Sequence, residues 1–199
     1  MKRLLSVGVL LLALTSFGGN NDIYLTQTAT GLTLTIDQIG AGNVAGTTQA
    51  RVTLSGTTMT VDLDQIGDTN TFAASILQGN GSSWTYKATG DSNALTFTQG
   101  DSATATSGDQ DFVVTGTSND INAKCNVIGC TNSWTVSGNS NDIDTLQSGK
   151  QDHDITVVLT GSSNNVDVDQ TDTVSTNVAN IISTTTSGTI NIDQCASGC

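Results

Sequence analysis

Short stretches in which apolar and polar residues alternate recur along the chain. Leu34 and Ile36 lie four and two residues before Gln38, and Val166 and Val168 lie at the same distances before Gln170, with Thr or Asp between them. A period of two is typical of a β-strand with one buried face, and no apolar stripe with the 3.6-residue period of a helix follows the N-terminal segment. The stretches end at Gln38, Gln65, Gln99, Cys125, Gln147, Gln170 and Gln194.

The end points of these stretches recur at a nearly constant interval of roughly 23 residues, which is the signature of an array of stacked units. Turn-forming residues follow each end point, and a second apolar stretch begins about eleven residues later. We therefore predict an all-β fold, a two-sheet parallel β-solenoid of about seven coils. The interval from Gln65 to Gln99 is longer, and we expect residues 78–88, with Trp84 and Tyr86, to form a protruding loop or hairpin.

The glutamines share the parity of the apolar residues and are therefore expected to point inward. A buried amide needs hydrogen-bond partners, and identical amides stacked at a strand spacing of about 4.8 Å can supply them to one another. Asparagines six residues before four of the end points form a second inward column. The ladders predicted from the residues contain Gln38, Gln65, Gln99, Gln147, Gln170 and Gln194, and Asn93, Asn119, Asn141 and Asn164.

The N-terminal segment differs from the array. Met1-Lys2-Arg3 is followed by an apolar run, Leu4 to Leu14, which is too short to span a membrane and is typical of a secretory leader. We expect a signal peptide over 1–18 with cleavage after Gly18, a single repeat domain over 19–199 and an extracellular location. A retained N-terminal anchor is the alternative, and no later segment is apolar enough to span a bilayer.

The charge of the chain argues against nucleic acid and anionic membranes as partners. After cleavage only Arg51, Lys87, Lys124 and Lys150 oppose 18 acidic residues, all Asp, so the net charge is 4 − 18 = −14. Asp144 and Asp167 would stack in adjacent coils. They and Asp169 are weak candidates for calcium, whose flexible coordination suits carboxylates on successive coils.

The four cysteines form two close pairs, and in an exported protein an even number indicates disulfides. We predict bonds from Cys125 to Cys130 and from Cys195 to Cys199. A zinc site built from both pairs is the alternative, although the spacings do not match common zinc frameworks.

The first repeat carries a specific motif. Residues 38–49 read Q-x-G-x-G-N-x-A-x3-Q, and residues 65–72 keep the Gln, Gly and Asn. This resembles the repeat of curlin, the subunit of bacterial curli fibres, specifically over residues 32–78. The resemblance implies an exported, self-assembling amyloid subunit of a biofilm matrix. It also implies a nucleator subunit and an outer-membrane exporter as partners, no cofactor, and ladder roles for Gln38, Asn43, Gln49, Gln65 and Asn70.

Three other functions are alternatives to fibre formation. A monomeric adhesive or ice-binding solenoid would use the outward residues Thr33, Thr35, Thr96 and Thr98, although Asp62, Asp144 and Asp167 interrupt their column. The chain lacks the order of glycines that a calcium-binding solenoid of nonapeptide repeats requires. For an enzyme, His153 between two aspartates is the one candidate general base. We expect it to lie in an exposed polar turn, and we expect no enzymatic activity.

The two ends of the array predict how copies would join. Residues 23–27 resemble half a coil with no strand before it, and the segment up to Gln194 resembles half a coil of the other kind. We therefore expect copies to stack head to tail, with residues 23–27 covering Val178–Ile181 and residues 32–38 covering Ile190–Gln194. Seven coils predict an axial advance of roughly 34 Å per copy.

Overall fold

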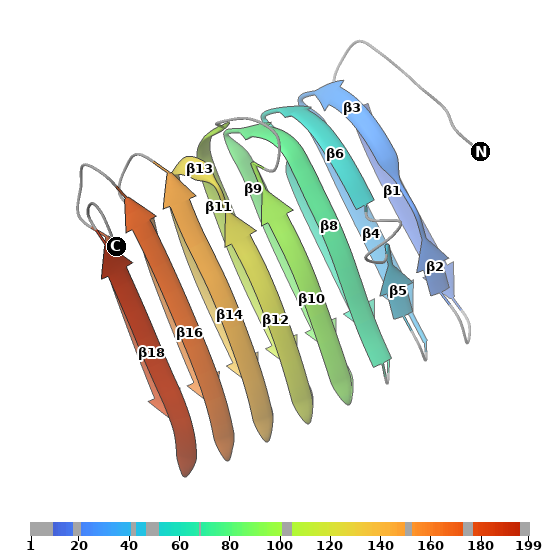
Figure 1. The fold of residues 1–199 in the computed structure, drawn as a ribbon. Coiled ribbons are helices and arrows are strands. Elements are labelled where there is room, and N and C mark those ends of the chain that lie inside the picture. Colours follow the sequence, from blue (N-terminus) through green and yellow to red (C-terminus); the bar gives the residue numbers. More distant parts are fainter. Residues whose placement is uncertain are drawn as a thin grey trace.

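The computed structural model is a parallel β-solenoid built from two sheets, which confirms the predicted fold class (Figure 1). The structure describes residues 10–17, 21–40, 43–46, 52–67, 69–100, 105–149, 153–172 and 177–195. Within these ranges every strand pair is parallel. No helix there is long and apolar enough to cross a membrane.

Each coil of the solenoid contributes one strand level to each sheet. The eight-stranded sheet contains, in spatial order, β1 (Leu10–Phe17), β4 (Leu32–Ile39), β7 (Thr60–Ile66), β9 (Ser82–Thr89), β11 (Ala105–Thr115), β13 (Val127–Ser137), β15 (His153–Thr160) and β17 (Val178–Thr184). The ten-stranded sheet contains β2 (Asn21–Ile23) with β3 (Thr26–Thr30), β5 (Asn43–Ala45) with β6 (Val52–Thr57), β8 (Thr69–Asn80), β10 (Ser92–Gln99), β12 (Ser118–Cys125), β14 (Ser140–Gly149), β16 (Ser163–Asp172) and β18 (Ser187–Cys195).

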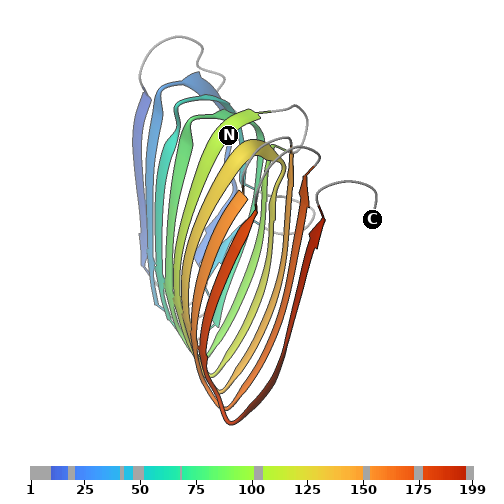
Figure 2. The ribbon, with the colours of Figure 1, turned by 90° about the vertical axis from the view of Figure 1, so that its left-hand side faces the viewer.

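The two sheets meet at a narrow edge and diverge towards a wide edge, so that the solenoid is wedge-shaped in cross-section (Figure 2). At the narrow edge the chain passes from the eight-stranded to the ten-stranded sheet through short turns. Gly67, Gly90 and Gly116 follow one another at these turns, and each backbone N–H bonds to a carbonyl one level further on. A Cβ on Gly90 would lie 2.1 Å from the Gly67 oxygen, so only glycine permits the coils to approach this closely.

The core lies between the sheets and is filled by the inward residues of every strand. Its middle is aromatic: Phe72 stacks on Tyr86 with ring centroids 5.3 Å apart, and Phe112 stacks on Trp134 at 5.4 Å. All four side chains are almost fully buried. Aliphatic residues at equivalent positions continue the core on both sides of this aromatic segment.

The long interval between Gln65 and Gln99 is not a loop, and that prediction was wrong. Residues 82–89 form β9, and Trp84 and Tyr86 are buried in the core rather than protruding. The interval therefore holds one additional strand. Because of this strand, the glutamine before the interval and the glutamine after it lie in different sheets. Gln65 ends an inward run of the eight-stranded sheet, whereas Gln99 ends β10 of the ten-stranded sheet.

Candidate functional site: amide ladders and open sheet edges

An uninterrupted column of asparagines lies at the narrow edge of the solenoid. It consists of Asn43, Asn70, Asn93, Asn119, Asn141 and Asn164, all buried. Nδ2 of each residue donates to Oδ1 of the next, at 2.9, 2.7, 2.7, 2.6 and 2.7 Å in chain order. The column stops at Asn164, which donates to Ser183 Oγ at 3.3 Å, because Gly188 holds the next position. The predicted asparagine ladder is thus confirmed, and Asn43 and Asn70 belong to it.

Backbone carbonyls take the remaining amide hydrogens of this ladder. Asn93 Nδ2 also donates to the Thr115 carbonyl at 3.1 Å, and Asn119 Nδ2 donates to the Ser137 carbonyl at the same distance. Each acceptor is the last residue of a strand in the opposite sheet. The asparagines therefore bond both along the stack and across the narrow edge, which ties the two sheets together.

Gln38 and Gln65 form a short ladder one residue before the ends of β4 and β7. Gln65 Nε2 donates to Gln38 Oε1 at 2.6 Å. The Tyr86 hydroxyl donates to Gln65 Oε1 at 2.9 Å, where the residue in register one level on is Ala88. Burial raises the pKa of the Tyr86 phenol well above its ordinary value, so the hydroxyl keeps its proton and remains a donor. Tyr86 thus replaces the donor that another glutamine would have supplied.

A second glutamine ladder lies at the wide edge, in the other sheet. Gln170 Nε2 donates to Gln147 Oε1 at 2.7 Å, and Gln194 Nε2 donates to Gln170 Oε1 at 2.6 Å. Gln147 Nε2 also donates to the Asp154 carbonyl at 3.2 Å, which links the ladder to the opposite sheet. The glutamines therefore form two columns, whereas the sequence predicted one. Gln49 lies outside the described residues.

Gln99 belongs to the column of the second ladder but is separated from Gln147 by Cys125. Its Oε1 accepts instead from Gln110 Nε2 of the opposite sheet, at 3.2 Å. Its side chain occupies the space above Gly108, where an added Cβ would lie 2.4 Å from Nε2. The roles of Gln110 and Tyr86 were missed because they compensate for ladder positions that other residues occupy, and no repeat pattern marks them.

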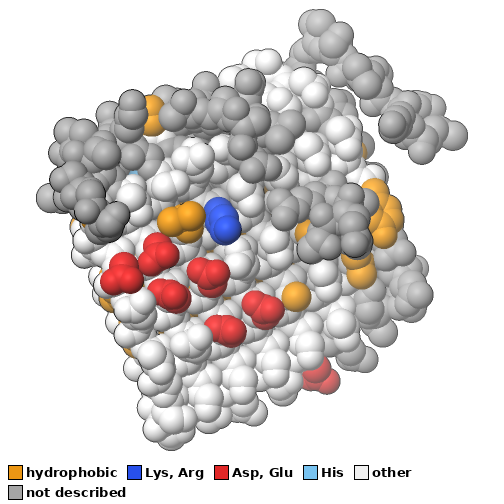
Figure 3. All heavy atoms as spheres, viewed as in Figure 1, with side chains coloured by type: hydrophobic (Ala, Val, Ile, Leu, Met, Phe, Trp, Pro, Cys, Tyr) orange, Lys and Arg blue, Asp and Glu red, His pale blue; other side chains and the backbone are white. Residues whose placement is uncertain are grey.

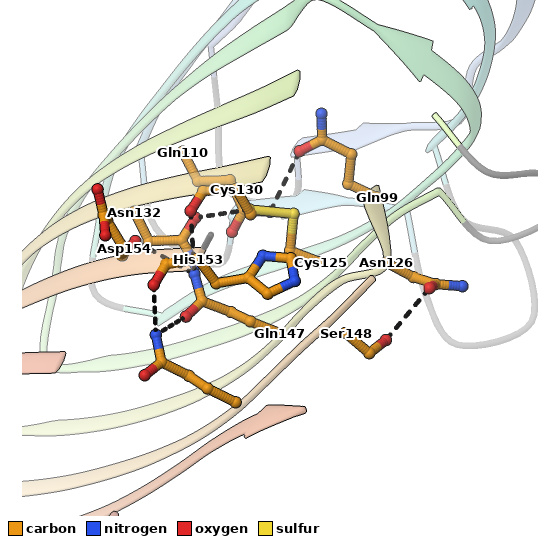
Figure 4. The surroundings of a disulfide bond; sticks show 11 residues. Gln99, Gln110, Cys125, Asn126, Cys130, Asn132, Gln147, Ser148, His153 and Asp154 are labelled. Atoms are coloured by element: carbon orange, nitrogen blue, oxygen red, sulfur yellow. Dashed lines mark hydrogen bonds between the residues drawn. A yellow bond between two sulfur atoms is a disulfide. The ribbon is translucent and has the colours of Figure 1, made fainter. Parts of the chain in front are cut away.

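The predicted disulfide between Cys125 and Cys130 is present, with an S–S distance of 2.08 Å (Figure 4). Cys125 ends β12 and Cys130 lies in β13, so the bond joins the two sheets across the wide edge. Cys195 is also disulfide-bonded. Its predicted partner Cys199 lies outside the described residues. Within the described part, no group of three or more His, Cys, Asp or Glu side chains is placed so that it could hold a metal ion.

The expectation that His153 lies in an exposed turn was wrong. His153 is fully buried at the first position of β15, in register with Cys130. Figure 4 shows its ring directed towards the disulfide. Its backbone carbonyl accepts a hydrogen bond from Gln170 Nε2 at 3.0 Å, so the residue forms part of the packed wide edge. The polar residues on either side of His153 resemble a turn, and for this reason the sequence did not predict its inward position.

Aspartates gather on the outer face of the ten-stranded sheet (Figure 3). Asp144 and Asp167 are in register, as predicted, and Asp169 pairs with Asp193 beside them. Burial raises the pKa of Asp169, and the carboxylates of Asp167, Asp193 and Asp144 raise it further. Burial also raises the pKa of Asp120, and the carboxylates of Asp142 and Asp144 raise it further. Crowded like charges therefore oppose stacking on this face.

The outward threonines considered for ice binding do not form one array. Thr33 and Thr35 lie on the eight-stranded sheet, whereas Thr96 and Thr98 lie on the ten-stranded sheet, and so they face opposite sides of the molecule. Asp62 follows Thr35 in its column, and Asp144 lies in the column of Thr96. A flat surface of regularly spaced threonines is therefore absent from these described strands.

The C-terminal end of the solenoid exposes core positions. Ile190 and Ile192 of β18 are 44% and 40% exposed, although they are in register with Val166 and Val168, which are fully buried. In the described part of the chain, β17 and β18 are the outer strands of their sheets. Gln194 Oε1 receives no hydrogen bond from a described residue, so the second glutamine ladder ends with an open acceptor. Among the described residues this end thus presents unpaired strand edges and apolar side chains, a combination that favours contact with another strand.

The N-terminal end has the same register as the C-terminal end. Ile23 belongs to the column that ends at Ile190, and Leu14 belongs to the column that ends at Ile181. The residue numbers differ by 167 in both sheets (190 − 23 and 181 − 14). One copy could therefore follow another in a single register, in which β2 and β3 continue the ten-stranded sheet after β18 and the position after β17 in the eight-stranded sheet is that of β1.

Comparisons with known proteins found no matching family model, no matching curated protein and no matching solved structure.

Proposed function

We propose that the chain is an exported structural subunit that assembles head to tail into a fibre of the extracellular matrix, in the manner of curlin. The observation that carries this proposal is the pair of matching solenoid ends, with Ile190 and Ile192 exposed at positions that are buried in the preceding coil. In such a fibre β18 of one copy pairs with β2 and β3 of the next. Gln27 then occupies the column position beyond Gln194, where a donor would continue the ladder.

This joint differs from the one expected from the sequence. Residues 23–27 lie in the ten-stranded sheet and would cover β18, not the strand around Val178–Ile181. The reason is the additional strand β9, which shifts all later glutamine-ended strands into that sheet. The ten-stranded sheet has eight strand levels, so the axial advance per copy becomes roughly 38 Å at a spacing of about 4.8 Å.

The proposal is tested by electron microscopy of the chain from Gly19 onward after incubation, together with growth from sonicated seeds. We expect filaments, and we expect Ile192→Lys to reduce elongation at least tenfold because a charge would be buried at the joint. Ile182→Lys is the matched control: Ile182 is 53% exposed on the outward face of the neighbouring strand β17, and its substitution should leave elongation unchanged. Persistent monomers, or equal elongation of the two variants, would contradict the proposal.

A further inference from the structure

The segment that precedes Gly18 contributes a strand to the eight-stranded sheet but none to the ten-stranded sheet. Strand β1 (Leu10–Phe17) is the outer strand of the eight-stranded sheet and pairs with β4 along its whole length. At the same level, the ten-stranded sheet is formed by β2 and β3, which lie beyond Gly18. Cleavage after Gly18 would therefore remove one strand from one sheet only, and β4 would become the edge of the eight-stranded sheet.

We propose that this cleavage turns the edge of β4 into a strand-accepting site for an extended segment of a second protein. The inference rests on the export and cleavage proposed above. Main-chain hydrogen bonds to an open sheet edge provide affinity in such complexes, and alternate side chains provide specificity. The pairing of β1 with β4 in the full chain supplies the register and the pattern of the expected occupant.

The floor of the site is apolar on one face. Leu32, Leu34 and Ile36 are almost fully buried in the full chain, and Leu10, Leu12 and Leu14 stand opposite them in register. The occupant should therefore carry apolar residues at three alternate positions. Gln38 lies next in the same row, opposite Ser16, so a small polar residue fits the fourth position.

The other face of β4 selects polar or cationic residues. Asp37 is in register with Asp64 of β7, and Asp62 lies on the same face. Burial raises the pKa of Asp64, and Asp62 and Asp37 also raise it, whereas Lys87 lowers it. A threonine, lysine or arginine at the position facing Asp37 suits this acidic surface, and β1 has Thr15 there.

Stacking of copies does not close the site. When β18 of one copy pairs with β2 and β3 of the next, β17 of the first copy lies at the level just before the missing strand. The ten-stranded sheet then holds β4 of the second copy about two strand spacings, or about 9.6 Å, from that β17. A fibre would thus present one open strand position at each joint, repeating every 38 Å or so.

Hydrogen–deuterium exchange of β4 tests the inference. The probe is a peptide with the sequence of residues 9–19 between lysine pairs, added to the monomeric chain from Gly19. We expect those alternate amides of residues 32–39 that face β1 in the full chain to exchange at least tenfold more slowly with the peptide, and as slowly as in the full chain. A control peptide with the changes Leu12→Asp and Leu14→Asp should have no effect, and residues 153–170 should be unchanged throughout, which verifies folding.

Two results would overturn the inference: protection of the β1-facing amides of β4 in the chain from Gly19 without any peptide, or equal protection of these amides by both peptides. In filaments of this chain, the outward-edge amides of residues 21–30 should become protected while the β1-facing amides of β4 remain exchangeable until the peptide is added. Failure to form filaments would contradict the proposed function alone, because binding of the peptide is measured on the monomer.

Discussion

An inward amide in this fold is stable because an identical amide lies one strand away. Asn119 illustrates this: it accepts from Asn93 at 2.7 Å and donates to Asn141 at 2.6 Å while fully enclosed. An unpaired buried amide would destabilise the fold, so each member depends on its neighbours. Outward amides such as Asn122 have water as an alternative partner and therefore contribute less to the stability of the fold.

Asn119→Ala should lower the free energy of unfolding by about 1–3 kcal/mol, because Asn93 and Asn141 each lose a buried partner. Asn122→Ala, on the same strand but facing outward, should change it by less than about 0.5 kcal/mol. Denaturant titration of the monomer measures both. Similar losses in the two variants would show that the ladder adds nothing to stability.

Protonation of the crowded aspartates should stabilise the fold and favour its assembly. The folded-state pKa values of Asp120 and Asp169 are raised above the ordinary 3.8, so their ionisation is less favourable in the folded chain than in the unfolded chain. The associated stability is fully present below pH 3.8 and is lost as the pH rises through the raised values. We therefore expect seeded elongation to be faster at pH 4 than at pH 7.

Asp169→Asn should reduce the difference in elongation rate between these two pH values, because it removes one of the clustered charges. Asp154→Asn, an exposed change on the opposite sheet, is the control and should preserve the difference. Identical elongation of the unmodified chain at both pH values would argue against repulsion between stacked aspartates.

At the scale of the element, the narrow turns decide how closely successive coils can approach. The glycine of each turn packs against the carbonyl of the preceding one and stands three residues before a ladder asparagine. This explains the recurrent Gly-x-x-Asn pattern.

Gly90→Ala should therefore disrupt the stack, since its Cβ would lie 2.1 Å from the Gly67 oxygen and 2.4 Å from Asn70 Nδ2. We expect a loss of more than about 2 kcal/mol, measured by thermal or denaturant unfolding, against Asp91→Ala as control. A neutral Gly90→Ala would contradict the close packing of the turns.

The strands, their inward faces, the asparagine ladder and the first disulfide could be predicted because each follows from a local period or spacing. The assignment of strands to sheets could not. β9 has the alternation of any other strand, but Ala88 stands in register with Gln65 of β7, so a count based on glutamines passes over this strand. His153 was misplaced for a similar reason, since flanking aspartates resemble a turn while the pleat places the ring inside.

At the scale of the whole molecule, the two ends of the ten-stranded sheet have a common register. The C-terminal end exposes core positions, as at Ile190 and Ile192, and carries an open ladder acceptor. Both features are satisfied by the same event, the addition of another copy along the axis. The acidic outer face in turn disfavours lateral association, because neighbouring fibres would bring aspartates together.

The central claim is that copies continue one solenoid along a common axis. A cryo-electron microscopy reconstruction of filaments formed by the chain from Gly19 tests it directly. The account predicts strands perpendicular to the filament axis, β18 beside β2 and β3 of the next copy, and an axial rise of roughly 38 Å per copy, which is eight strand spacings. Copies packed side by side, or a rise that is not eight strand spacings, would contradict it.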